Sequence, residues 1–181
     1  MRRNYRIRKD AAREGEVDES VSFDVFLVAF RDGKNAPADR DAARAVLSRH
    51  NYLHDPESDH YRVELSDGSS FSMYSEGLDG GTEVFNGGMI VLHGISPAIC
   101  DFIFEFGRAA NCAILPAMEP ACVLLSREDL ARHLPASLTD NCQQVVVADG
   151  AEVRAALGGG YAAWRAYRDH VVRQYGENPE Q

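Results

Sequence analysis

The sequence predicts an α+β fold in which a mixed or antiparallel sheet has helices packed on one face and is extended by C-terminal helices. Three observations lead to this prediction. Residues 87–120 have the pattern of a strand, a helix and a second strand. Residues 61–74 alternate between apolar and polar side chains as a β-hairpin does, and helical patterns recur towards the C-terminus.

The length of 181 residues suits one folded domain. We expect this domain to span residues 21–176, with a charged N-terminal arm at 1–20 and a polar tail at 177–181. No apolar run approaches the roughly 18 to 20 residues that cross a bilayer. The basic residues 1–9 lack the apolar core of a secretory signal, so the sequence predicts a cytoplasmic protein without membrane contact.

The first strand is expected at Phe23 to Phe30, where Asp24 is the only charged residue. Such continuous apolar character is typical of a central strand buried on both faces. A helix should follow soon after Pro37, because Ala43, Val46 and Leu47 form one apolar stripe.

The hairpin at residues 61–74 has a register that the side chains determine. A three-residue loop at 66–68 pairs Val63 with Phe71 and Tyr61 with Met73, so that the apolar residues share one face. It also places Gly68 where a left-handed conformation is needed. The other face of this hairpin is then polar and available to solvent or a partner.

The strand at Met89–Leu92 leads into a helix with Ser96 as N-cap and Pro97 at its first position. One apolar face of this helix fits a core, but Phe104 points away from that face. We therefore expect Phe104 to be covered, either by the C-terminal helix or by another protein.

The C-terminal part should contain a strand at Cys122–Leu125, a short helix from Ser126, a buried strand at Val145–Val147 and a final helix at about Tyr161–Tyr175. The Gly158–Gly160 run is predicted to stop a helix and act as a hinge. Two strand–helix units flanking a hairpin are typical of a ferredoxin-like or related sandwich.

Charge is distributed unevenly along the chain. The net charge is −9, yet residues 1–13 carry six Arg or Lys and one Asp, so residues 14–181 carry −14. An acidic body repels nucleic acid and can attract a basic partner, although many acidic proteins use such charge simply for solubility. We therefore predict no nucleic-acid partner, and a basic protein is the favoured class.

No arrangement of residues predicts catalysis or a cofactor. The glycine-rich segment 76–88 lacks the Gly-Lys-Ser/Thr of a phosphate loop. His50, His54 and His60 are the only clustered candidates for metal ligands, but His54 and His60 should lie in a flexible connection after a helix ends, so no metal site is predicted. The four cysteines show no C-x-x-C spacing and are expected to be buried, reduced thiols.

The segment Ile114–Pro120, followed by Ser126–Asp129 and Leu134–Pro135, resembles small uncharacterised bacterial proteins. In its size, its acidity and its lack of a catalytic motif the chain is similar to immunity proteins that pair with secreted bacterial toxins. This resemblance implies a protein that acts by binding, in the cytoplasm of the producing cell.

Together these features predict a binding protein, an immunity-type inhibitor that occludes a toxin active site with an acidic surface. The residues expected to contact the partner are Glu57, Asp59, Tyr74, Asp79, Glu83 and Glu119. The alternative is a small enzyme or ligand-sensing domain with a pocket near residues 76–88 and 116–120. The chain is expected to be a monomer or a small homo-oligomer, and in an oligomer Phe104 would mark the interface.

Overall fold

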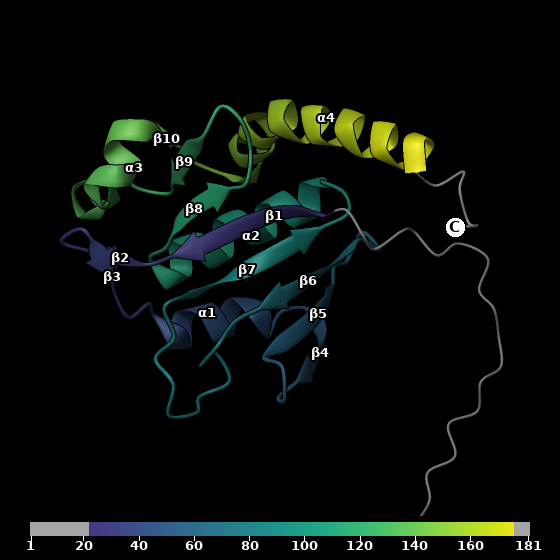
Figure 1. Ribbon diagram of the computed structural model, residues 1–181. Helices are drawn as coiled ribbons and strands as arrows, with labels where there is room; N and C mark the ends of the chain where they lie inside the picture. The colour runs from purple at the N-terminus through teal and green to yellow at the C-terminus, as the bar shows by residue number, and fades with distance from the viewer. Residues whose placement is uncertain (1–21, 176–181) are drawn as a thin grey trace, which may run out of the picture.

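An eight-stranded sheet is the centre of the computed structural model, which describes residues 22–175 (Figure 1). The charged arm predicted at residues 1–20 and the polar tail predicted at 177–181 lie outside the described residues. In spatial order, the strands are β10 (Gln143–Val146), β9 (Cys122–Leu125), β8 (Ala113–Pro116), β1 (Phe23–Val28), β7 (Gly87–Leu92), β6 (Ser70–Tyr74), β5 (His60–Glu64) and β4 (Asn51–Asp55).

Neighbouring strands run antiparallel except β9 and β10, which run parallel. Together with the helices, this mixed sheet confirms the predicted α+β class. A separate short ribbon, β2 (Phe30–Arg31) with β3 (Lys34–Asn35), follows β1.

The predicted hairpin register is confirmed. Val63 pairs with Phe71 and Tyr61 pairs with Met73. The backbone N–H of Leu65 donates to the carbonyl of Ser69 at 2.9 Å, which closes the three-residue loop. Gly68 in that loop has a φ of +81°, a conformation that glycine adopts without a steric penalty.

Helices α1 (Arg40–Leu47), α2 (Pro97–Ala110) and α4 (Gly150–Tyr175) lie on one face of the sheet, and Figure 1 shows α1 and α2 behind the strands. The helix α1 starts after Asp39, whose carboxylate accepts the Ala42 N–H at 3.0 Å. The helix α2 starts after Ser96, whose hydroxyl accepts the Ile99 N–H at 3.2 Å, as predicted. Both caps satisfy backbone donors that a helix N-terminus otherwise leaves without partners.

Among residues 22–175, the elements that cover the other face of the sheet are the 3₁₀ helix η1 (Glu128–His133) and the helix α3 (Ala136–Asn141), at its β8–β9 end. Leu130 and Leu134 of this region pack with Val123 and Leu125, which flank the inward-facing Leu124 and so point to the opposite face. The two faces are therefore covered to very different extents.

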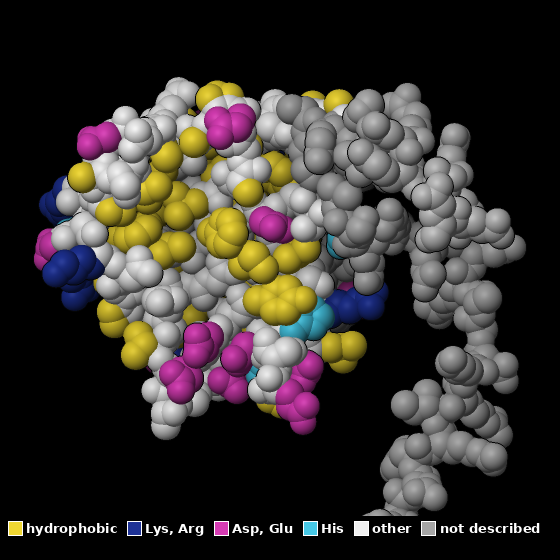
Figure 2. All heavy atoms as spheres, viewed as in Figure 1, with side chains coloured by type: hydrophobic (Ala, Val, Ile, Leu, Met, Phe, Trp, Pro, Cys, Tyr) yellow, Lys and Arg dark blue, Asp and Glu magenta, His cyan; other side chains and the backbone are white. Residues whose placement is uncertain are grey.

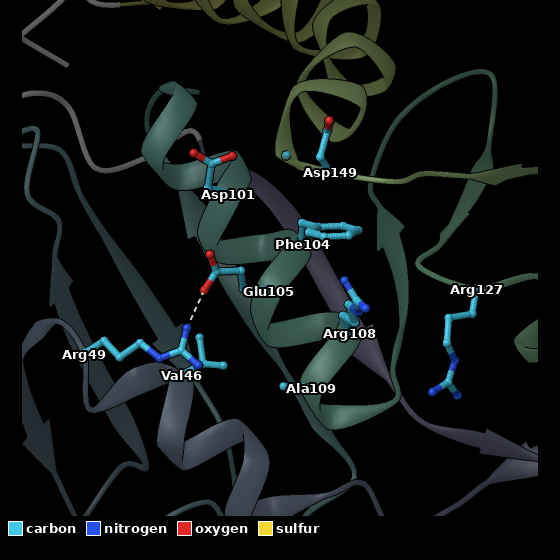
Figure 3. A pocket seen from close by; sticks show the side chains of 10 residues that line it. Val46, Arg49, Asp101, Phe104, Glu105, Arg108, Ala109, Arg127 and Asp149 are labelled. Atoms are coloured by element: carbon cyan, nitrogen blue, oxygen red, sulfur yellow. Dashed lines mark hydrogen bonds and ion pairs between the residues drawn. The ribbon is translucent and has the colours of Figure 1, made fainter.

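Phe104 is covered within the chain, since only 7% of its surface is exposed and it belongs to the same core cluster as Val153 and Leu157 of α4. Figure 3 shows Phe104 projecting from α2 towards the start of α4. There, a Cβ on Gly150 would lie 2.6 Å from the Cα of Asp101. Glycine therefore allows α4 to approach α2 closely enough to cover the ring.

Two C-terminal predictions were wrong. The final helix begins at Gly150 rather than near Tyr161, so the Gly158–Gly160 run lies inside α4 and does not stop it. Burial of Val153 and Leu157 stabilises this helix despite the low helix propensity of glycine. The strand predicted as buried at Val145–Val147 is the exposed edge strand β10, and of these three residues only Val147 is fully buried.

None of the helices within residues 22–175 is both long enough and apolar enough to span a bilayer.

Candidate functional site

One face of the central strand β1 is open to solvent. Phe23, Val25 and Leu27 point to the helices and are buried, whereas Phe26 between them is 40% exposed. The prediction that β1 is central is confirmed, but the prediction that it is buried on both faces was wrong. No described helix lies over Phe26, because η1 and α3 cover the β8–β9 end of this face.

Apolar side chains form a line across this open face. In the strand register Tyr74 pairs with Met89, Met89 with Phe26 and Phe26 with Leu115. We call these four residues the apolar row. Strands lie about 4.8 Å apart, so the row spans about 14 Å. Figure 2 shows the yellow side chains of this face in the middle of the molecule.

His60 extends the apolar row onto β5. It pairs with Tyr74, and the two rings lie 4.9 Å apart between centroids. The His60 Nε2 atom also lies 3.0 Å from the Ser72 hydroxyl, at hydrogen-bond distance. These contacts hold the Tyr74 ring, which is 41% exposed, against the sheet at the edge of the row.

Acidic side chains gather along one margin of the open face. In Figure 2 the magenta groups lie below the yellow side chains, where Figure 1 places the β4–β5 turn and the β6–β7 loop. Glu57 and Asp59 belong to that turn, and the Asp59 carbonyl accepts the Ser75 N–H at 3.0 Å. Asp79 lies on the β6–β7 loop as well, but it lines the cavity against α1 on the opposite side of the sheet. Three predicted contact residues, Glu57, Asp59 and Glu83, lie on these two segments beside Tyr74. We call them the acidic margin.

Glu119 lies apart from the acidic margin. It is exposed in the connection between β8 and β9, and β1, β7 and β6 separate that connection from β5 in the sheet. A partner that covers the row from Tyr74 to Leu115 would approach Glu119 at the Leu115 end of the row, whereas the acidic margin lies at the Tyr74 end.

Phe26, Met89 and Leu115 were not predicted as contact residues. Each lies in an apolar run, and such runs give no signal of which face is uncovered. Whether a face of the sheet is left uncovered depends instead on how many helices the chain has to cover its eight strands.

The three candidate histidines are not brought together. His50 packs edge-on against Phe102 at 5.4 Å, and the His54 ring stacks on Tyr61 at 4.2 Å. His54 and His60 lie on strands β4 and β5, not in a flexible connection, and they point to opposite faces of the sheet. Within residues 22–175 no three His, Cys, Asp or Glu side chains are grouped to hold a metal ion.

The four cysteines carry free thiols, as predicted, but the prediction that all four are buried was wrong for Cys122 and Cys142, which are partly exposed. Cys100 and Cys112 are fully buried, and burial raises the pKa of Cys100 to about 11 and that of Cys112 to about 12. Burial also raises the pKa of Cys122, which is partly exposed. Thiols with raised pKa values form little thiolate at neutral pH, so these three are poor nucleophiles.

The two segments of the predicted alternative pocket each line a cavity of their own. Leu78 and Asp79 line a cavity against α1 and β4, whereas Met118 and Pro120 line another against α4 and β10. The two predicted segments therefore contribute to separate cavities.

A further cavity of about 610 Å³ lies where α1, α2 and the start of α4 meet (Figure 3). Arg49 and Glu105 form an ion pair at 2.9 Å on one side, and Arg127 binds Asp129 at 3.1 Å. Asp101, Arg108 and Asp149 also line this cavity and form no ion pair within the described residues, so its free charges are of both signs.

Comparisons of the chain with protein-family models, with curated proteins and with solved structures found no significant match.

Proposed function

We propose that the protein acts by binding a basic protein through its open sheet face, with the apolar row at the centre and the acidic margin at the side. The observation that carries this proposal is the row itself, four side chains in register. No described helix covers Tyr74, Met89 and Phe26, and Leu115 borders the part of the face that η1 and α3 cover. Protein interfaces combine an apolar centre, enriched in aromatic residues and Met, with a polar periphery.

The charge of the margin favours a basic partner. The exposed carboxylates there attract lysine and arginine side chains, and such complementarity speeds encounter and selects the partner. A sheet face also presents rigid side chains, so that little conformational freedom is lost when Phe26 and Tyr74 are covered.

Within this class we propose an immunity-type inhibitor that acts in the cytoplasm of the producing cell. It would neutralise a toxin by covering the basic surface that binds the toxin's substrate. The acidic body and the sequence resemblance described above support this choice.

The test uses the full chain as bait against lysate of its own organism, with Phe26→Asp and Val146→Asp as paired variants. Val146 is an apolar side chain that is 49% exposed on the edge strand β10, outside the apolar row, so it is a matched control. We expect wild type and Val146→Asp to retain a basic protein that Phe26→Asp loses by at least about 30-fold in affinity, as for a central interface residue. Circular dichroism confirms that each variant is folded.

The captured protein is then expressed in a bacterial host. Growth arrest that wild type relieves and Phe26→Asp does not would support the inhibitor. A partner with no effect on growth would refute the inhibitor but leave the binding function. A partner held equally by Phe26→Asp, or a wild-type dimer that Phe26→Asp converts to a monomer, would overturn the proposed use of the row.

A further inference from the structure

A second site lies on the opposite side of the sheet, in a cavity of about 550 Å³ between α1, the β4–β5 strands and the β6–β7 loop. Its size falls within the range of small-ligand sites. Leu47 and Leu78, both buried, form apolar parts of its wall. The charged and polar side chains that line it come from three separate parts of the chain.

Two buried polar atoms at this cavity have no hydrogen-bond partner within the described residues. They are the hydroxyl of Tyr61 and Nε2 of His54, whose rings stack at 4.2 Å and are nearly parallel. Tyr61 is only 2% exposed. Buried polar atoms are almost always paired, because leaving them unpaired is costly, so these two atoms indicate a place where a ligand supplies the partner.

The Tyr61 hydroxyl is a donor. Burial, followed by the charges of Asp79 and Asp59, raises the pKa of Tyr61 to about 12, so the proton remains at neutral pH. The group that fits beside it is therefore an acceptor. Arg44 lines the same cavity and makes no ion pair within the described residues, and a guanidinium next to a hydroxyl donor suits a carboxylate.

A simple anion does not fit the remaining charges. Asp41 and Asp79 also line the cavity and would repel a ligand that is only negative. A simple cation would face Arg44 and leave the Tyr61 donor unmatched. A ligand with both a carboxylate and an ammonium group satisfies both sets of charges.

We propose that this cavity binds a free α-amino acid, with its carboxylate at Arg44 and Tyr61 and its ammonium group at Asp41 and Asp79. Leu47 and Leu78 contact its side chain. This site is separate from the apolar row, because Tyr61 and His60 are neighbours on β5 and point to opposite faces.

The experiment titrates the full chain with each of the twenty standard amino acids, by calorimetry and by thermal shift. We expect at least one to bind with a Kd below about 1 mM, and its decarboxylated amine and its deaminated acid to bind at least about 10-fold more weakly. Tyr61→Phe, which removes only the oxygen, and Arg44→Gln should each weaken binding by about 10-fold or more.

Arg49→Gln is the matched control, because Arg49 lies two residues beyond the end of α1 and pairs with Glu105 outside this cavity. It should leave the affinity unchanged, and so should Phe26→Asp on the opposite face. Failure of all twenty amino acids to bind at 10 mM would overturn the proposal. Equal binding of the amine alone, or an affinity that Tyr61→Phe does not alter, would also overturn it.

Discussion

The glycine run within α4 allows a sharp test of how this helix packs. Gly159 is exposed, and a Cβ there would meet no atom within 4 Å. At the next residue, Gly160, a Cβ would lie 2.6 Å from Cε and 2.7 Å from Cβ of Met118. Substitution of each glycine by alanine changes helix propensity equally but packing very differently.

Gly159→Ala should stabilise the protein by about 0.5 to 1 kcal/mol, because alanine loses less backbone entropy in a helix. Gly160→Ala has the same gain but must displace Met118, whose Cβ is fixed to the backbone between Pro116 and Pro120. Overpacking of this kind costs about 1 to 3 kcal/mol, so a net loss of about 1 kcal/mol is expected.

Thermal unfolding followed by circular dichroism measures both effects. For a chain of this size 1 kcal/mol corresponds to a change in Tm of about 2 to 4 °C. Tm should rise for Gly159→Ala and fall for Gly160→Ala, and Met118→Ala should reduce the cost of Gly160→Ala. An equal rise in Tm for both single variants would show that α4 does not contact Met118 closely, and would refute this reasoning.

Three further predictions concern buried groups. Because the pKa of Tyr61 is raised to about 12, the unfolded chain loses this proton at a lower pH than the folded protein does. The free energy of unfolding should therefore fall by up to about 1.4 kcal/mol per pH unit between pH 10 and 12. Urea unfolding measures this fall, which should be shallower for Tyr61→Phe. Cys112 should react with iodoacetamide at pH 8 far more slowly than the half-buried Cys142, as mass spectrometry can follow, and equal rates would disprove its burial. Gly87→Ala should lower the free energy of unfolding by more than about 3 kcal/mol, because φ is +136° and a Cβ would overlap the Leu27 carbonyl. Gly68→Ala, where φ is also positive but the space is open, should cost about 1 kcal/mol. Urea unfolding measures both losses.

The sequence predicts local structure well where side-chain alternation and capping agree. The hairpin register follows from the alternation of Tyr61 and Val63 opposite Phe71 and Met73, because any other register mixes apolar and polar side chains on one face. The start of α2 follows from Ser96, since a hydroxyl at that position accepts a backbone N–H.

The sequence misleads where tertiary packing decides the outcome. Asn51–Asp55 is exposed along most of its length and has Pro56 after it, yet it forms β4 because β5 offers it an unpaired edge. The Gly158–Gly160 run continues as helix because α4 is anchored by buried residues before it. Neither effect is visible in local propensity.

Some residues of the candidate site could be proposed from the sequence, and others could not. Tyr74 and the acidic residues stand out as polar or aromatic positions beside turns, and the structure places most of them along one margin. Phe26 and Met89 are not distinguishable from core residues in sequence. Their exposure depends on how many helices cover the sheet, which is a property of the whole fold.

The apolar row and the acidic margin should contribute to different steps of partner binding. Exposed carboxylates act over about 8 to 10 Å at physiological ionic strength, so they govern encounter, whereas the row contacts the partner only after docking. Raising salt from 50 to 500 mM should therefore lower the association rate of the captured partner and leave its dissociation rate nearly unchanged in surface plasmon resonance. Phe26→Asp should do the reverse, and Glu57→Gln should reproduce part of the salt effect. An association rate that is independent of salt would show that the acidic margin does not steer the partner.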